Sequence, residues 1–323
     1  MERQYRVGIV GATGMVGQRF ISLLQGHPWF RTTALITPFR DGEVDYEALD
    51  RLVDNQIAGG VSALVAAGTT GEPATMTWVE HMNVIRRVVE RTNGRVPVIA
   101  GTGSNSTQEA IGAAKNAKSV GADAQLVVTP YYNKTTQAGL IAHYRAVADS
   151  CDLPMIVYNV PSRTGVNIAP ATLQEICRHE NVVGVKEANA DVGQALEKLR
   201  LCGADAAFYS GNDDLAVPLM ACGFKGVISV LSNMLPKETS AMAKAAMDGD
   251  GKSAATMQLK YLPLINALFC ETSPIPVKAA MAAMGLCGEE IRLPLVPMQA
   301  ENRRKLYGIM RELGIAMPTL DRK

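Results

Sequence analysis

The 323-residue chain is predicted to be an α/β protein, a (β/α)8 TIM barrel with a C-terminal helical annex. From residue 34 onward, short β-rich runs alternate with amphipathic segments of helical period, which is the pattern of βα units on a parallel sheet. The runs number eight, and eight such units with right-handed crossovers close naturally into a barrel. An open doubly wound sheet is the alternative, because alternation alone does not prove closure.

The eight strands are expected at 34–37, 63–67, 96–100, 124–128, 155–159, 182–186, 206–209 and 226–230. Helical patterns lie between them at 46–58, 78–91, 107–120, 137–150, 172–179, 192–201 and 215–222. The Met-rich and Ala-rich stretch 242–247 is interpreted as a core-facing helix, and the patterns at 257–270 and 275–284 as the eighth barrel helix and the annex. The predicted division is therefore an N-terminal fragment (1–30), the barrel (31–250) and a C-terminal helical region (251–323).

Composition restricts the class of function. With 47% hydrophobic and 20% charged residues and a net charge of +1, the chain has the profile of a soluble enzyme, and neither nucleic acid nor a membrane surface is an expected partner. Six cysteines lie singly and four histidines lie far apart, which argues against a metal site and a disulfide framework. No signal peptide or membrane span is evident, so a cytoplasmic location is expected.

Lys186 is the candidate nucleophile. It ends a run, 182–186, that otherwise has the character of a buried central strand. Burial disfavours a charged ammonium, and a neutral amine can attack a carbonyl carbon. The alternative is an ion-paired lysine, or one that extends its charge to solvent just past the strand end.

Polar and glycine-rich segments follow five of the predicted strands, at 68–72, 129–133, 158–165, 186–187 and 210–213. In a barrel these carboxyl ends meet at one mouth, where the active site lies. Each segment alone has a structural explanation, such as a tight turn, a packing tyrosine or a surface ion pair. Together they supply an amine, phenols and a hydroxyl for proton transfer, and a guanidinium for a substrate carboxylate. This set suits an aldolase that forms an imine with a keto acid.

Five segments resemble the dihydrodipicolinate synthase family, now called the 4-hydroxy-tetrahydrodipicolinate synthases. They are GTTGE (68–72), VTPYYN (128–133), YNVPSRTG (158–165), GVKEA (184–188) and SPIPVK (273–278). The resemblance covers roughly residues 34 to 315, in order and with matching spacing. It implies a lyase of lysine and diaminopimelate biosynthesis that condenses pyruvate with L-aspartate 4-semialdehyde. It also implies a homotetramer built from tight dimers, with no metal and no organic cofactor.

The resemblance assigns roles to four catalytic residues. Lys186 would form the Schiff base with pyruvate, and Tyr158 would relay protons together with Thr69 and Tyr132. Tyr132 would reach in from a neighbouring subunit. Glu187 is expected on the opposite face of its strand, without a catalytic role.

Four further residues would bind substrate. Thr70 would hold the pyruvate carboxylate, Arg163 would receive the carboxylate of the semialdehyde, and Gly211 and Ile228 would line the pyruvate pocket. N-acetylneuraminate lyase and keto-deoxy sugar acid aldolases share the barrel and the lysine, so the fold leaves them as alternatives. Arg163 favours the synthase, because a fixed cation suits a short acceptor with its own carboxylate. A catalytically inactive barrel that serves as a binding scaffold is the alternative of another class, although every catalytic position is present.

L-lysine inhibits many members of this family at a subunit interface, and we hypothesise that it inhibits here. The matching positions supply acceptors for an ammonium and a partner for a carboxylate, and they are Ala74, His81, Asn105, Glu109 and Tyr131. Pro73 and Trp78 depart from the common bacterial pattern.

The first thirty residues predict a different unit. Residues 5–20 have the character of a strand, a glycine turn and a helix start, of the type that holds a dinucleotide pyrophosphate, and they resemble the N-terminus of aspartate-semialdehyde dehydrogenase. A lone βα unit cannot bury its apolar face or satisfy its strand edges. We therefore expect this Rossmann-like fragment to bind no NAD(P).

Overall fold

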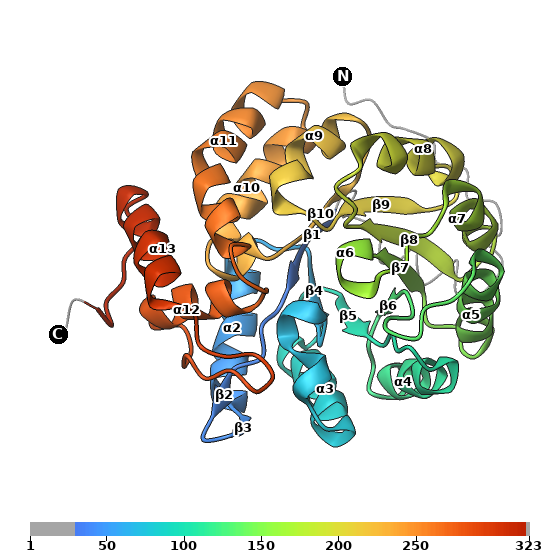
Figure 1. The fold of residues 1–323 in the computed structure, drawn as a ribbon, viewed down its shortest axis with the longest axis horizontal. Coiled ribbons are helices and arrows are strands. Elements are labelled where there is room, and N and C mark those ends of the chain that lie inside the picture. The colour runs from blue at the N-terminus through green and yellow to red at the C-terminus, as the bar shows by residue number, and fades with distance from the viewer. Residues whose placement is uncertain (1–29, 321–323) are drawn as a thin grey trace.

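The computed structural model describes residues 30–320, and their core is a closed barrel of eight parallel strands (Figure 1). Around the barrel the strands follow the order β1-β10-β9-β8-β7-β6-β5-β4, so the first and last strands of the chain pair and close the sheet. The prediction of a TIM barrel is confirmed, and the open doubly wound alternative is wrong for this chain.

The barrel strands are β1 (Phe30–Ala34), β4 (Ala63–Ala66), β5 (Val98–Gly101), β6 (Ala124–Val128), β7 (Met155–Asn159), β8 (Val182–Glu187), β9 (Ala207–Ser210) and β10 (Gly226–Ser229). The helices that follow the first seven are α2 (Tyr46–Ala58), α3 (Trp78–Thr92), α4 (Thr107–Ser119), α5 (Gln137–Asp149), α7 (Pro170–Cys177), α8 (Val192–Cys202) and α9 (Ala216–Ala221). Short turns η1 (Thr69–Gly71), η2 (Pro73–Thr75), η3 (Asp213–Leu215), η4 (Leu231–Asn233) and helix α6 (Pro161–Thr164) lie at strand ends.

Two sequence-based assignments need correction. The first strand lies at Phe30–Ala34 instead of 34–37. The prediction missed it because the threonines of β1 are polar, although one of them hydrogen-bonds to helix α2 as part of the strand. The eighth barrel helix is α10 (Pro236–Met247), which contacts β1 and β10, and not the 257–270 segment. The structure also contains a small antiparallel hairpin, β2 (Phe39–Arg40) and β3 (Glu43–Val44), that the sequence analysis did not predict.

The C-terminal annex consists of α11 (Gly251–Leu268), α12 (Ile275–Ala283) and α13 (Ala300–Glu312). Its apolar core joins these helices to α2 through Leu52 and to the end of β10 through Leu231. In Figure 1 the annex lies at one side of the barrel, next to α2 and the hairpin. We propose a boundary near residue 250, since α10 ends at Met247 and α11 begins at Gly251.

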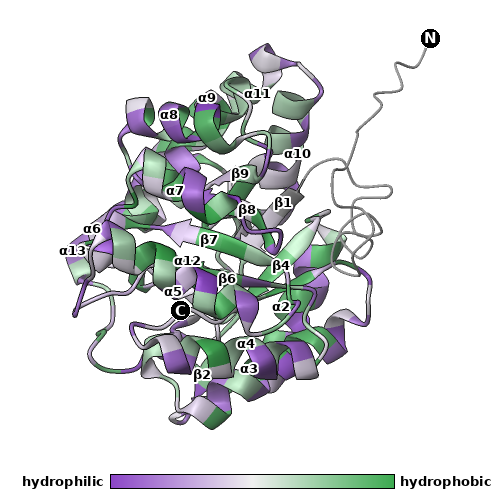
Figure 2. Ribbon diagram, turned by 90° about the vertical axis from the view of Figure 1, so that its right-hand side faces the viewer, coloured by the Kyte–Doolittle hydropathy of each residue, from purple (hydrophilic) through white to green (hydrophobic). Residues whose placement is uncertain are grey.

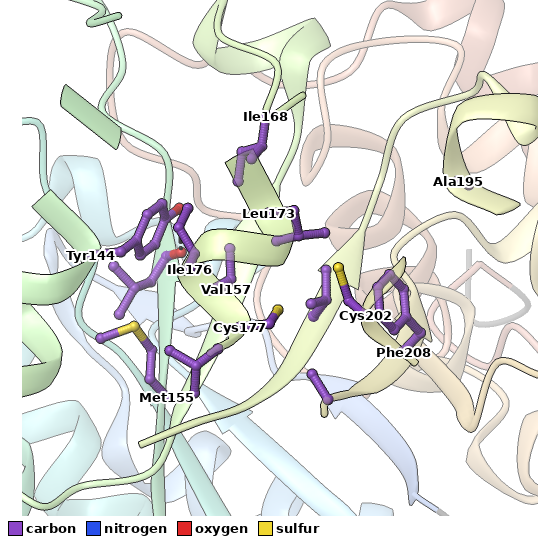
Figure 3. Close-up of a cluster of buried hydrophobic side chains, with 14 of the residues drawn as sticks. Tyr144, Met155, Val157, Ile168, Leu173, Ile176, Cys177, Ala195, Cys202 and Phe208 are labelled. Atoms are coloured by element: carbon purple, nitrogen blue, oxygen red, sulfur yellow. Dashed lines mark hydrogen bonds between the residues drawn. The ribbon is translucent and has the colours of Figure 1, made fainter. Parts of the chain in front are cut away.

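Two apolar layers hold the barrel. Inside the strands, alternate residues such as Ile156 and Leu126 form an interior cluster. Outside, the other faces of β7 and β8 pack against α5, α7 and α8, and Figure 3 shows Val157 and Phe208 among the side chains of this layer. Figure 2 shows the result in hydropathy: apolar strands at the centre, and outer helices that carry both polar and apolar residues. This two-sided burial explains the near-continuous apolar strand sequences.

Buried polar groups lock the closure between β1 and β10. Asn233 accepts from the backbone N–H of Ile36 (3.1 Å) and donates to the Ala34 carbonyl (2.9 Å). Gln56 of α2 donates to the Ser232 carbonyl (2.9 Å) and accepts from the Thr33 hydroxyl (2.6 Å). All these groups are buried, and each forms its hydrogen bond with a group from another element at the junction of β1 and β10. These bonds therefore fix which strands pair where the barrel closes.

Among residues 30–320, no helix combines the length and the apolar character that crossing a membrane requires. The Rossmann-like fragment predicted for residues 1–30 falls, except for its last residue, outside the described part of the chain.

Candidate active site

Lys186 and Tyr158 stand side by side at the carboxyl end of the barrel. They are register partners on β8 and β7, and the Lys186 Nζ atom lies 4.4 Å from the centre of the Tyr158 ring. Lys186 is only 6% exposed, and Tyr209 of β9 is its register partner on the other side. The amine thus lies over the face of one aromatic ring, in a largely buried position between two tyrosine-bearing strands.

The absence of a side chain at Gly211 leaves space for the Lys186 side chain. A Cβ atom at this position would lie 3.0 Å from Lys186 Cε and 2.7 Å from Ala188 Cβ. The backbone N–H of Gly211 donates to the Glu187 carbonyl (2.7 Å), so the glycine is fixed against β8. Any larger residue here would displace the lysine stem or the strand end.

Glu187 points to the outer face of β8, as predicted. Its carboxylate accepts from Lys198 Nζ (2.8 Å), Asn159 Nδ2 (2.7 Å) and the Asn189 N–H (2.9 Å), and its side chain is fully buried. The lysine partner belongs to α8, outside the barrel. Glu187 therefore has structural partners and no access to the mouth.

A cavity of about 580 Å³ opens at this end of the barrel. Its lining includes Thr69, Tyr158 and Arg163, three of the predicted site residues, and it has the size of a small-molecule site. Side chains from the annex region, Ser273, Pro274 and Leu295, also line it. The barrel mouth is thus completed by the C-terminal part of the chain.

The two threonines lie in the turn η1, directly after β4. Thr69 lines the cavity and Thr70 is buried, 4% exposed. The turn is bracketed by two non-glycine residues with left-handed backbone, Ala67 (φ 53°) and Glu72 (φ 56°). A Cβ atom at Gly101 of the neighbouring strand would lie 2.1 Å from the Ala67 carbonyl oxygen, so the glycine is required for this close approach.

Arg163 lies in α6, above the end of β7, and its guanidinium is solvent-accessible on the cavity side. One nitrogen, Nη2, donates to the Ser273 carbonyl (3.0 Å). The other donors remain for a ligand, since no other hydrogen bond of this side chain is formed within residues 30–320. An anchored, exposed guanidinium at the rim suits a substrate carboxylate.

Tyr132 does not face the cavity of its own chain. Its side chain is 90% exposed and its backbone is left-handed, with φ 67°. Its neighbour Tyr131 is 40% exposed and does line the cavity. The structure thus separates two adjacent tyrosines and holds Tyr132 outward in a strained conformation.

Ile228 lies in the barrel interior, 1% exposed, in the same apolar cluster as Tyr158. It also lines a small cavity of about 30 Å³ at the opposite, amino-terminal end of the strands. It therefore lies in the barrel interior and outside the lining of the 580 Å³ cavity.

Four of the five positions matched to a lysine site line the 580 Å³ cavity: Ala74, His81, Glu109 and Tyr131. The His81 Nε2–H donates to the Gly101 carbonyl (2.8 Å), and burial lowers the pKa of its ring, so His81 is neutral at pH 7. Glu109 accepts from the Ser104 hydroxyl (2.7 Å). Asn105 lines a separate pocket of about 350 Å³, and its carbonyl accepts from Asn133 Nδ2 (3.0 Å).

Sequence reasoning gave no role to Glu72 or Lys278, although both lie in quoted motifs. Their side chains form a buried ion pair, with Lys278 Nζ 2.6 Å from Glu72 Oε1. The two residues are 206 positions apart, so only their shared motif context could have suggested the contact.

Chemically, the site offers a shielded primary amine, an adjacent phenol, hydroxyls on a fixed turn and a guanidinium at the rim. These are the groups that imine formation with a carbonyl compound and subsequent proton transfers require.

Comparison with known proteins gives a consistent result. A model of the dihydrodipicolinate synthetase family matches residues 31–313. The 4-hydroxy-tetrahydrodipicolinate synthase of Geobacter metallireducens is 52% identical over 279 residues, which cover 86% of this chain and 96% of that protein.

Two solved structures of similar proteins share the fold. The dihydrodipicolinate synthase of Acinetobacter baumannii complexed with pyruvate has a TM-score of 0.87 and 44% identity, and covers 89% of this chain and 99% of its own. The enzyme of Cyanidioschyzon merolae with lysine bound has a TM-score of 0.86 and 40% identity, with coverages of 90% and 99%.

Proposed function

This chain belongs to the dihydrodipicolinate synthetase family, and on that premise we propose that it is a lyase that condenses pyruvate with L-aspartate 4-semialdehyde through a Schiff base on Lys186. The product is 4-hydroxy-tetrahydrodipicolinate, a precursor in lysine and diaminopimelate biosynthesis. The relatives of similar length carry this name, and one similar structure is described with pyruvate bound.

One observation carries the proposal: Lys186 is 6% exposed, and its amine lies 4.4 Å from the ring centre of Tyr158, a residue that lines the 580 Å³ cavity. A buried amine with no carboxylate partner among its described hydrogen bonds and ion pairs differs from Lys198 and Lys278, which are both buried against glutamates. Lys186 therefore differs from these two lysines in having no ion pair within 4.0 Å in the described part of the chain, although the buried Asp213 carboxylate lies within electrostatic range of it.

The first half of the reaction activates pyruvate. The Lys186 nitrogen adds to the ketone carbon, and water leaves after the carbonyl oxygen has gained protons. The protonated imine withdraws electrons from the methyl group, so a methyl proton is lost and an enamine forms. Tyr158 and Thr69 are the groups that we assign to these proton transfers, and Thr70 to the pyruvate carboxylate.

The second half forms the carbon–carbon bond. The enamine carbon attacks the aldehyde, and the resulting alkoxide takes a proton from the relay. The amino group of the acceptor then adds to the imine carbon and displaces Lys186, which regenerates the free amine. Arg163 would hold the acceptor carboxylate throughout, and its anchored guanidinium at the rim supports this assignment.

The decisive experiment is reductive trapping. The protein is incubated with pyruvate and sodium borohydride, and the mass of each lysine-containing peptide is measured. We expect one adduct, on the peptide that contains Lys186, and none on the peptides with Lys198 or Lys278. Lys186→Ala is the control and should remain unlabelled. An unchanged mass, or an adduct on another lysine, would exclude the proposed chemistry.

Substrate choice is tested separately. Activity with L-aspartate 4-semialdehyde as acceptor, and none in the cleavage of N-acetylneuraminate or keto-deoxy sugar acids, is expected. Arg163→Met should raise the KM for the semialdehyde without affecting trapping by pyruvate, because the guanidinium contacts only the acceptor.

We further propose that Tyr132 acts on a partner subunit within a dimer of a homotetramer. Its 90% exposed side chain and left-handed backbone support this, because a relay residue held away from its own cavity can act only elsewhere. The six cysteines, all in the described part of the chain and all unpaired, support a cytoplasmic location.

L-lysine is proposed as an inhibitor that enters beside the active site. Glu109 and the Tyr131 phenol face the same cavity as Thr69, and a similar structure is described with lysine bound. An ammonium would pair with the Glu109 carboxylate, and the tyrosine hydroxyl would donate to the lysine carboxylate.

A further inference from the structure

The turn that carries Thr69 and Thr70 is attached to the C-terminal annex by one buried ion pair. Lys278, on the annex helix α12, places Nζ 2.6 Å from Glu72 Oε1, and the two side chains are 1% and 0% exposed. Glu72 follows the turn directly, and its N–H donates to the Thr69 carbonyl (3.2 Å). The annex therefore contacts the residue that ends the turn.

Glu72 holds a left-handed backbone conformation that residues other than glycine and asparagine rarely adopt. Its φ is 56°, and its carbonyl accepts from the N–H (3.1 Å) and the hydroxyl (3.1 Å) of Thr75. Strain of this kind persists only where the surrounding structure imposes it. The buried carboxylate is the part of Glu72 that connects it to a distant element, and Lys278 is its described partner.

The Glu72–Lys278 ion pair also lies beside an aromatic ring and a second cation. Lys278 Nζ also lies 4.2 Å from the centre of the Phe39 ring, and the Arg292 guanidinium carbon lies 4.2 Å from the same ring. Arg292 donates to the Thr75 carbonyl (3.1 Å), so the annex contacts η2 as well. Burial raises the pKa of Glu72 and lowers the pKa of Lys278, so each charge depends on the other.

We propose that Lys278 and Glu72 are positioning residues, and that their ion pair fixes the turn of residues 68–72 so that the Thr69 and Thr70 hydroxyls face the substrate. This inference rests on the proposed function, in which Thr69 relays protons and Thr70 holds pyruvate. It gives the annex a part in the reaction: the C-terminal helices set the geometry of a turn at the opposite end of the sequence.

The alternative is that the pair only stabilises the fold. The two explanations differ in their kinetic consequences. A misplaced turn lowers kcat and raises the KM for pyruvate more than the KM for the semialdehyde, because Arg163 lies in α6 and contacts the annex at Ser273 and not through the ion pair. A loss of stability alone removes active protein, so the number of sites falls while both KM values stay the same.

The test measures kinetics per active site in Glu72→Gln, Lys278→Met and the double variant. Borohydride trapping with pyruvate, at saturating concentration, counts the sites that form the imine. The double variant leaves no unpaired buried charge and should recover much of the melting temperature lost by the single variants. Leu306→Ala, which truncates a fully buried core residue of α13, is the control for destabilisation of the annex.

We expect kcat per trapped site to fall on the order of 10- to 100-fold in all three pair variants, with a raised KM for pyruvate, because a misplacement of about 1 Å can cost up to about 100-fold. The double variant should stay slow although it is more stable, and Leu306→Ala should have the kcat of the unaltered protein. Wild-type kinetics per site in Glu72→Gln, or activity in the double variant that returns with its stability, would overturn the positioning role. If the unaltered protein traps no pyruvate, the proposed function itself fails.

Discussion

Asn159 and Glu187 form on the outer face of the barrel the same cross-strand pair that Tyr158 and Lys186 form on the inner face. Asn159 Nδ2 donates to Glu187 Oε1 (2.7 Å), and the two residues are register partners one step beyond the site pair. A shift of one residue between β7 and β8 would break this buried hydrogen bond and would also separate the phenol from the amine. The outer pair therefore fixes the register on which the inner pair depends.

Removal of the Lys198 charge should strongly destabilise the fold, because this charge pairs with the buried Glu187 carboxylate. Lys198→Met leaves a fully buried carboxylate without its cation, and we expect the free energy of unfolding in urea to fall by about 3–5 kcal/mol. The double variant Glu187→Gln/Lys198→Met should recover part of this loss. Equal stability of Lys198→Met and the unaltered protein would show that the asparagine alone satisfies the carboxylate.

Tyr158→Phe should separate imine formation from turnover. The ring and its contact with Lys186 remain, so long incubation with pyruvate and borohydride should still label Lys186, at a lower rate than in the unaltered protein. The kcat of condensation should fall on the order of 10²- to 10³-fold, because a positioned proton donor contributes rate factors of this size. Retention of the full kcat would remove Tyr158 from the relay.

Coexpression should reveal whether Tyr132 works across subunits. Lys186→Ala and Tyr132→Phe are each expected to be inactive as homo-oligomers. In a mixed dimer, the subunit with Lys186 intact would receive Tyr132 from its partner, so one complete site appears and activity returns.

The matched control pairs Lys186→Ala with Tyr158→Phe. Both residues belong to the same chain's site, so no mixed dimer contains a complete site and no activity should return. Activity in the control, or none in the Tyr132 mixture, contradicts the trans assignment.

The ion pair between Arg292 and Glu80 should give the annex an acid-sensitive attachment. Hydrogen bonds from Arg292, and then from Thr77, lower the pKa of Glu80 from 4.5 to about 2, against some opposition from burial. A carboxyl with a lowered pKa contributes stability that is fully present above the unfolded-state value and is lost as the pH falls from about 4.5 towards 2.

Arg292→Met should therefore lower the free energy of unfolding at pH 6 by on the order of 1–2 kcal/mol, and by less at pH 3.5, as measured by urea denaturation, because the hydrogen bonds from Thr77 to Glu80 remain. Arg200→Met, which removes an exposed partner of Glu197, should have little effect at either pH. If Arg292→Met lowers the free energy of unfolding by the same amount at both pH values, the loss comes from packing against Phe39 and not from the ion pair.

Millimolar L-lysine should inhibit condensation, and Glu109→Gln should raise the half-inhibitory concentration about ten-fold or more, which corresponds to ~1.4 kcal/mol of lost binding. Lys115→Gln, an exposed change on the same helix α4, is the control for altered charge. Unaltered activity of the wild-type protein in about 10 mM L-lysine would refute the hypothesis.

The barrel could be predicted because its strands are buried on both faces and so leave apolar runs of strand length, such as 155–159. The Lys186–Tyr158 proximity also follows, since both residues end neighbouring strands. β1 was placed too late because its threonines, Thr32 and Thr33, are polar yet fully buried by partners far along the chain. No local pattern contains that information.

The Glu72–Lys278 pair could not be predicted for the same reason. A buried lysine and a buried glutamate have no sequence signature that distinguishes them from surface residues, and their meeting depends on how the annex packs against α2 and the segment after β10. The outward orientation of Tyr132 likewise follows from a backbone angle that the sequence YYN permits but does not specify.

The seam between β1 and β10 also bears on how the molecule assembles during synthesis. Phe30 finds its neighbour Gly226 only after the ribosome has added nearly the whole barrel, and until then the first strand presents an open edge. Contacts of such long range are formed slowly, and an incomplete chain is then exposed to pairing with other nascent chains. The edge of β1 is covered only once β10 pairs with it and the Asn233 side chain binds the Ala34 carbonyl.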